Sequence, residues 1–147
     1  MKAIVTVGIS GSGKSTWANS MESETCAVFE RDQIRWEFME ADGLEPKWEN
    51  WDWGYESQVT ELVHYFIGKF ARSGVDLIIS DTNLNPKFRN QLIGRLMDEG
   101  YDVEVKFFNV PVDECIRRDS ERDESKRVGE KVIRQQWQRF SKEFFEQ

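Results

Sequence analysis

Residues 8–15 read Gly8-Ile9-Ser10-Gly11-Ser12-Gly13-Lys14-Ser15 and fit the phosphate-loop pattern G-x-x-x-x-G-K-[ST] at every fixed position. The apolar run 2–7 before them predicts a buried strand, and residues 14–21 after them predict the start of a helix. A glycine turn between a strand and a helix directs backbone N–H groups and the positive helix end at one point, where phosphates can bind. The stretch therefore indicates a nucleoside-triphosphate site.

Each residue type in this loop suits a contact with ATP·Mg²⁺. Glycines let the backbone approach the phosphates without a Cβ in the way. Lys14 is expected to contact the β- and γ-phosphates, and the Ser15 hydroxyl is expected to bind Mg²⁺. The motif predicts the phosphate donor but not the acceptor. The predicted nucleotide site comprises Gly11, Ser12, Gly13, Lys14, Ser15 and Thr16.

The chain has 147 residues, 39% of them hydrophobic and 13% aromatic, which predicts a single domain over residues 1–147. A net charge of −7 argues against a broad nucleic-acid-coating surface, so a nucleic-acid partner would need a local basic patch. Cys26 and Cys115 are far apart, without a C-x-x-C motif, and are expected to be buried free thiols. With no signal segment and no apolar run of membrane-spanning length, we expect a cytoplasmic protein without a membrane partner.

The remaining pattern alternates strands and helices. Strands are predicted at 26–29, 75–80 and 102–108. Amphipathic helices are predicted at 54–72, from Pro86 to a stop at Gly100, and at 128–145. The helix at 128–145 is expected to bury Val132, Ile133, Trp137, Phe140 and Phe144. This order predicts a three-layer α/β fold with a parallel four-stranded sheet and helices on both faces.

Charged residues follow the predicted strands, at the sheet edge where ligands collect in α/β folds. Asp32 and Arg35 come after the second strand and share one side if a helix begins there, although a surface-charged helix start is an equal interpretation. Asp81 follows the third strand in a Walker-B-like place, near the metal or orienting an arginine; turn chemistry alone is the alternative. Arg118 and Arg122 share a helix face and predict an arginine-bearing lid, unless that charged stretch is simply solvated.

Residues 40–53 lack a steady period and carry three tryptophans among acidic side chains. Base stacking by these rings is one hypothesis, but the acids would repel phosphates, so packing of the rings onto the body is favoured. His64, the single histidine, is expected to be a packed or surface residue, because no second metal-type ligand accompanies it.

The motifs 8–16, Arg31-Asp32 with Arg35, Ile79-Ser-Asp-Thr-Asn-Leu-Asn-Pro86, and Arg118 with Arg122 resemble one family over nearly the whole chain. This is the kinase half of the phage-type polynucleotide 5′-kinase/3′-phosphatase, within the P-loop kinase superfamily. The stretch 79–86 is the specific part of the likeness, since the phosphate loop is widespread. The resemblance implies transfer of the ATP γ-phosphate to the 5′-hydroxyl of DNA or RNA, in a phage or repair setting.

The same resemblance implies a role for each matching residue. Asp32 would be the general base on the acceptor hydroxyl, and Lys14 and Ser15 would bind ATP·Mg²⁺. Arg118 and Arg122 would reach the ATP phosphates from the lid, Arg122 being the better candidate for the transition state. The implied acceptor-binding residues are Arg35 on the adjacent phosphate, Thr82 assisting it, Asp81 orienting Arg35, and Val128 and Val132 under the terminal base.

Three departures from the family pattern stand out. No phosphatase domain follows, so removal of a 3′-phosphate is not predicted. The acidic segment 40–53 stands where a more basic stretch is expected, which leaves open the length and strand type of the nucleic acid. Gly129 stands where proline is common, which predicts a freer lid hinge, and Ser10 replaces a frequent proline.

Two other functions fit the sequence. A small-molecule kinase acting on a nucleoside or sugar is favoured by the acidic surface. A nucleotide-dependent switch or adaptor, with slow hydrolysis and Asp32 serving only as a helix cap, is the second alternative.

Overall fold

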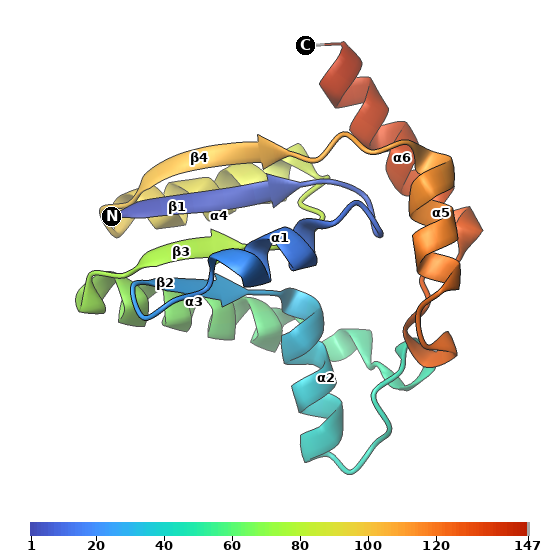
Figure 1. Ribbon diagram of the computed structural model, residues 1–147. Helices are drawn as coiled ribbons and strands as arrows, with labels where there is room; N and C mark the ends of the chain where they lie inside the picture. The colour runs from blue at the N-terminus through green and yellow to red at the C-terminus, as the bar shows by residue number, and fades with distance from the viewer. Residues whose placement is uncertain (147) are drawn as a thin grey trace.

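The computed structural model describes residues 1–146 and centres on a sheet of four parallel strands (Figure 1). The strands are β1 (Lys2–Val7), β2 (Cys26–Phe29), β3 (Asp76–Ile79) and β4 (Asp102–Phe107). Their order across the sheet is β2-β3-β1-β4, and Val5 pairs with both Ile79 and Val105. The predicted parallel four-stranded α/β fold is thereby confirmed.

Helices cover both faces of this sheet. Helix α1 (Lys14–Met21) lies on one face, and α3 (Glu56–Ser73) and α4 (Pro86–Asp98) lie on the other (Figure 1). The face toward α3 and α4 is apolar because alternate strand residues point to it, and the α3 stripe Val59, Val63 and Ile67 packs against them. Helix α4 begins as predicted: the Asn85 side chain accepts hydrogen bonds from two N–H groups, and Pro86 follows at the first position.

The segment after β2 is more helical than expected. Helix α2 (Arg31–Ala41) is followed by two short 3-10 turns, η1 (Trp48–Asn50) and η2 (Trp53–Tyr55). Trp51, between the turns, is buried with only 6% exposure and belongs to the main core. One tryptophan of this segment therefore packs onto the body, as the favoured interpretation holds.

The C-terminal part forms an arm opposite the carboxyl ends of the strands (Figure 1). It consists of α5 (Val112–Ser120), the turn η3 (Glu124–Lys126) and α6 (Glu130–Phe145). Helix α6 begins two residues later than predicted, because Gly129 has φ +95°, which is not helical. A second core cluster joins the arm to β1 through Val7, Ile9, Cys115, Ile133 and Phe140.

Two burial predictions need correction. Val132 is 41% exposed, since it lies on the face of α6 that is turned away from Ile133. Both cysteines are free, but only Cys115 is buried; Cys26 is half-buried on the edge strand β2. Among residues 1–146, no helix combines the length and the hydropathy needed to cross a membrane.

Candidate active site

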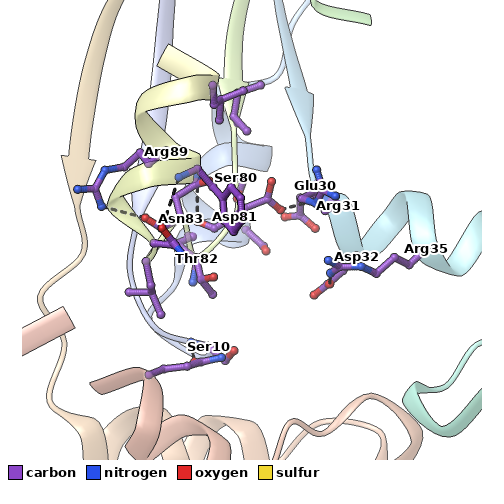
Figure 2. Close-up of a pocket in the computed structure, with 18 of the residues that line it drawn as sticks. Ser10, Glu30, Arg31, Asp32, Arg35, Ser80, Asp81, Thr82, Asn83 and Arg89 are labelled. Carbon is purple, nitrogen blue, oxygen red and sulfur yellow. Dashed lines mark hydrogen bonds and ion pairs between the residues drawn. The ribbon is translucent and has the colours of Figure 1, made fainter. Parts of the chain in front are cut away.

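A cleft of about 1360 Å³ opens at the carboxyl ends of the strands. Its lining comes from the phosphate loop with the start of α1, the start of α2, the turn after β3, parts of α3 and α4, and the face of the arm formed by α5 and α6. Figure 2 shows Asp32 and Arg35 on α2 across open space from Ser10, with the 80–83 turn beside them. The topology explains the gathering, because all four parallel strands end on this side.

Lys14 is buried at the base of the phosphate loop. Its Nζ donates hydrogen bonds to the Ile9 carbonyl at 2.7 Å and to Ser12 Oγ at 3.3 Å. Burial lowers the pKa of Lys14 to about 8, and the charges of neighbouring carboxylates, Asp81 foremost, offset only part of this effect. Ser15 and Thr16 follow Lys14 in the first turn of α1, where both are exposed and line the cleft.

The phosphate loop packs tightly against the arm. Gly11 has φ +84°, and a Cβ added there would come within 2.6 Å of the Cys115 carbonyl oxygen, so only glycine fits. The Gly11 carbonyl accepts a hydrogen bond from Arg118 Nη1 at 3.1 Å. The Ser10 N–H donates to Gln136 Oε1 on α6 at 2.8 Å. The arm therefore holds the loop in shape from outside.

Asp81 connects the third strand to helix α2. Its Oδ1 accepts the Arg31 backbone N–H at 2.8 Å, so the carboxylate caps the first turn of that helix from another part of the chain. Burial raises the pKa of Asp81 to about 6, although the Arg31 N–H and the positive charges nearby favour its ionised form. The negative charge of Asp81 also raises the pKa of Lys14.

Asp32 and Arg35 lie together on α2, as their spacing predicted. Arg35 Nη1 donates to Asp32 Oδ1 at 2.6 Å, and half of the Asp32 side chain is exposed in the cleft. Arg35 is further held by Glu56 at the start of α3, with Nε–Oε1 2.6 Å and Nη2–Oε2 3.0 Å. The carboxylates that orient Arg35 are thus Asp32 and Glu56. The implied orientation by Asp81 is not what the structure shows, because Asp81 is engaged by the Arg31 backbone.

Glu56 is the centre of a compact ionic cluster. Arg31 Nη2 donates to its Oε2 at 3.0 Å, and Trp51 Nε1 donates to its Oε1 at 3.0 Å. Partial burial alone would raise the pKa of Glu56, but hydrogen bonds and charge from Arg35 and Arg31 outweigh it and lower that pKa to about 2. The cluster fixes the guanidinium of Arg35 at the cleft wall.

The turn after β3 is tied to β1. Gly8 N–H donates to the Thr82 carbonyl at 3.1 Å, and Asn83 Nδ2 donates to the Thr6 carbonyl at 2.8 Å. Buried Arg89 on α4 donates to the Asn83 carbonyl and pairs with Glu143 on α6. These contacts hold Thr82 and Asp81 beside the phosphate loop.

The lid arginines lie on the arm as expected, and both line the cleft. Arg122 pairs with Asp119 at 3.4 Å and keeps 42% of its side chain exposed. Buried Asp119 also accepts the N–H groups of Val128 at 3.0 Å and Gly129 at 2.9 Å. The φ of +95° at Gly129 excludes proline, whose φ is fixed near −65° by its ring, so glycine is needed here for its conformation.

Of the two valines implied as a base-binding surface, only Val132 lines the cleft. Val128 instead packs against the core cluster of the arm, because Asp119 holds its backbone inward. His64 is exposed at the far wall of the same cleft, and burial of its ring, with the charges of Arg95 and Arg31, lowers its pKa.

The cleft contains oxygen atoms without partners. Ser80 Oγ and Glu30 Oε1 are buried and have no hydrogen-bond partner among the described residues, and both residues line the cleft. No group of three or more His, Cys, Asp or Glu side chains arranged for a metal occurs within residues 1–146.

Sequence reasoning missed Glu56, Asp119 and Gln136. Glu56 comes directly after the irregular segment, and its partners on α2 are 21 and 25 positions away. Asp119 lies in a stretch of charged residues, and its composition gives no sign that this one side chain is buried. An acid three residues before a lid arginine, as Asp119 is to Arg122, was the one signal available for it.

The phosphate loop after β1, the parallel sheet and the arginine-bearing arm over the loop define a nucleotide-binding domain of the P-loop kinase type. The family model described as "AAA domain" matches residues 4–146. The chain therefore belongs to this family.

Three relatives illustrate the range of the likeness. A protein of Autographa californica nuclear polyhedrosis virus, provisionally named a bifunctional polynucleotide kinase/RNA ligase, is 25% identical over an alignment of 145 residues, and the match covers 95% of this chain and 21% of that protein. The solved Pnkp1/Rnl/Hen1 RNA repair complex contains a similar chain, with TM-score 0.77, 23% identity, and coverage of 97% of this chain and 46% of that one. The APS kinase CysC of Mycobacterium tuberculosis, solved with AMPPNP and APS, has TM-score 0.54, 20% identity, and coverage of 82% and 69%.

The chain thus spans about a fifth of the viral relative and less than half of the repair-complex chain. At these identities the solved structures show the fold alone.

Proposed function

We propose that this chain is an ATP-dependent polynucleotide 5′-hydroxyl kinase. The observation that carries the proposal is that one cleft holds both the phosphate loop and the half-exposed Asp32 carboxylate, with Arg35 bonded beside it. The arrangement offers a donor site, a base and an anion-binding group for the acceptor. The naming of the viral relative and of the RNA repair complex supports a polynucleotide acceptor.

In the proposed reaction, the acceptor 5′-hydroxyl oxygen attacks the γ-phosphorus of ATP and its proton passes to Asp32. The bond between the γ-phosphorus and the bridging β–γ oxygen breaks, and ADP leaves with that oxygen. Lys14 in its ammonium form stabilises the negative charge on the β- and γ-phosphates. Arg118 and Arg122 contribute further positive charge from the arm, and positioning supplies most of the rate.

Arg35 is proposed to bind the phosphate on the 3′ side of the terminal nucleoside. The carboxylates of Asp32 and Glu56 neutralise this guanidinium, and each accepts hydrogen bonds from some of its N–H groups. A phosphate at that place would compete with Asp32, the more exposed of the two partners, while Glu56 keeps the side chain in place. Thr82 and Val132 lie on the same cleft surface as further acceptor contacts.

The residues present fit Mg²⁺. Ser15 would supply the direct ligand, and Asp81 with the unpartnered Glu30 and Ser80 oxygens could bind its waters. When bound, Mg²⁺ would neutralise charge developing on the phosphate oxygens.

A small-molecule kinase is the second candidate. The net charge of −7 and the fold shared with the APS kinase favour it. The ionic cluster around Glu56 favours the polynucleotide kinase, because its ion pairs between α2 and α3 hold Arg35 beside the proposed base Asp32.

The deciding experiment measures transfer from γ-labelled ATP to a 5′-hydroxyl oligonucleotide, beside nucleosides, sugars and APS. Labelling of the oligonucleotide with little labelling of the small molecules is expected. Labelling of a small molecule while the oligonucleotide stays unlabelled would replace the first candidate with the second.

A further inference from the structure

The tryptophans of the 40–53 segment do different things in the structure. Trp51 is in the core, whereas Trp53 is 62% exposed, the second most exposed position among aromatic rings after Phe88 and level with Phe145. The hypotheses of packing and of stacking therefore apply to different rings. Single exposed hydrophobic side chains are common on protein surfaces, so the neighbours of Trp53 decide whether its placement has a role.

Trp53 forms part of an ordered aromatic pair. Its ring is parallel to that of Trp48 within 9°, with centroids 6.2 Å apart. The Arg35 guanidinium carbon lies 5.6 Å from the Trp53 centroid and 5.7 Å from the Trp48 centroid. Arg35 lines the cleft, and the two indole rings adjoin its guanidinium without lining the cleft themselves.

The pair is held in place on both sides. The Asp52 carboxylate accepts the Gly54 N–H at 2.9 Å and caps the turn that carries Trp53. Trp51 anchors the same turn through its hydrogen bond to Glu56. Trp48 packs edge-on against Trp36 of α2 at 4.8 Å between centroids. A ring fixed in this way can bind a flat partner at a low entropic cost.

The acids of this segment oppose a nucleic acid less than their number suggests. Lys47 pairs with Glu49 at 2.9 Å and with Glu45 at 3.6 Å. Asp52 is engaged in its cap, and Glu56 is neutralised by two arginines. The acids nearest to Trp53 in the sequence therefore already have partners in the protein.

From this geometry we propose that Trp53, backed by Trp48, stacks on the base of the second nucleotide of the acceptor. The proposal rests on the proposed function and narrows it. The terminal hydroxyl lies at Asp32, the phosphate next to it at Arg35, and the following base on the indole adjoining Arg35. Stacking needs an exposed base face, so the preferred acceptor is a single-stranded or frayed 5′ end of two or more nucleotides.

The test compares two acceptors in wild type and Trp53→Ala. One is a nucleoside 3′-monophosphate, which ends at the Arg35 contact, and the other is a 5′-hydroxyl dinucleotide 3′-phosphate. For Trp53→Ala we expect KM for the dinucleotide to rise by about 5- to 100-fold, the loss that removal of one base-stacking aromatic produces, with kcat unchanged. KM for the mononucleotide should stay the same. Wild type should lose the same advantage when the second nucleotide of the dinucleotide is abasic.

Tyr65→Ala is the matched control, because Tyr65 is 58% exposed on α3 and does not line the cleft. It should change neither KM. Trp53→Phe should recover part of the dinucleotide KM. An equal KM change for both acceptors, or an abasic dinucleotide that binds as well as the intact one, would overturn the stacking proposal while leaving the kinase activity in place.

A binding measurement separates failure of stacking from failure of the proposed function. A dinucleotide with 2-aminopurine as its second base should lose fluorescence on binding to wild type and not on addition of Trp53→Ala. If neither acceptor is phosphorylated but this quenching is seen, the stacking site stands and the kinase assignment falls. Absence of quenching in wild type overturns the stacking site whatever the kinase assay gives.

Discussion

Glu56 and Arg35 form a two-point ion pair between the start of α3 and the middle of α2, with N–O distances of 2.6 and 3.0 Å. The pair brings together residues on either side of the tryptophan-bearing segment. It also determines where the arginine beside Asp32 can point. Arg35 is therefore positioned by tertiary structure, not by its own helix alone.

Replacing Glu56 by Gln should destabilise the protein by about 2 kcal/mol, the range for hydrogen bonds to charged groups. The amide can accept from only one of the two arginines with its oxygen and faces the other with an NH₂ group. Urea unfolding at neutral pH measures the change. Glu99→Gln is the control, because Glu99 has a similar exposure of 26% against 27% but pairs only with Arg95 of its own helix; it should cost less than about 0.5 kcal/mol.

The same variant has a defined pH dependence. The pKa of Glu56 is lowered to about 2 in the folded protein, from an ordinary value near 4.5. Between these two pH values the unfolded chain therefore binds more protons than the folded protein. The stabilisation by this group is fully present above pH 4.5 and is lost as pH falls toward 2. The stability difference between wild type and Glu56→Gln should therefore shrink from pH 5 to about pH 3. A difference independent of pH would contradict the charged pair as its source.

Asp32→Asn should lower kcat for phosphate transfer by about 100- to 10,000-fold, the contribution of a general base. The affinity for ATP should change little, because the hydrogen bond of the Asp32 carboxylate is to Arg35 of its own helix and its charge has only a small effect on Lys14. Glu37→Gln, the same chemical change at an exposed position of α2, should leave both unchanged. Near-normal turnover of Asp32→Asn would refute the base assignment.

ATP affinity should fall at alkaline pH. Lys14 loses its proton at about pH 8 in the free protein because burial disfavours the ammonium form. Phosphates bind the ammonium form and raise its pKa, so each pH unit above this value should weaken ATP binding by up to about tenfold. Titration calorimetry from pH 7.5 to about 9.5, in two buffers of different ionisation enthalpy, should also detect proton uptake. Equal Kd values across this range would contradict the lowered pKa.

Asp81 adds an internal check on that titration. Its carboxylate charge raises the pKa of Lys14. Asp81→Asn should therefore shift the alkaline loss of ATP affinity to lower pH, whereas loss of an unrelated structural contact would weaken binding equally at every pH.

Asp119→Asn should loosen the arm. Its two carboxylate oxygens accept the Val128 and Gly129 N–H groups, and an asparagine leaves one of these donors facing an NH₂ group, at a cost of about 1–3 kcal/mol. We expect kcat to fall with the placement of Arg122, and protease cleavage near 121–129 to become faster. Asp123→Asn is the control, since Asp123 caps only the exposed turn η3. Unchanged cleavage in Asp119→Asn would show that the hydrogen bonds of Asp119 do not hold residues 121–129 in place.

The phosphate loop, the sheet and the order of elements could be predicted because each depends on local sequence. The run 8–15 carries its own turn, and the apolar strands 2–7 and 76–79 and the alternating strand 102–107 differ in pattern from the helices between them. Asp32 and Arg35 were predictable as a pair because a helix places them one turn apart.

The contacts that shape the site depended on tertiary structure instead. Glu56 and Arg35 are 21 positions apart, and nothing in the intervening irregular segment gives its path. Trp51 is buried and Trp53 is exposed although they are two residues apart, because a 3-10 turn begins at Trp53. The periodicity of the sequence does not reveal a turn this short. The family resemblance implies the same base-binding role for Val128 and Val132, but the hydrogen bond from the Val128 N–H to Asp119 holds Val128 in the core of the arm.

The identity of the acceptor can be tested by one comparison of kcat/KM values. The acceptors are a single-stranded oligonucleotide with a 5′-hydroxyl, the same oligonucleotide with a 5′-phosphate, and the free nucleoside of its first base, all with γ-labelled ATP. We expect label at the 5′ end of the first, none on the second, and a nucleoside kcat/KM lower by about 100-fold or more, because the nucleoside lacks the phosphate that Arg35 is proposed to bind. A nucleoside kcat/KM equal to or above that of the oligonucleotide would contradict it.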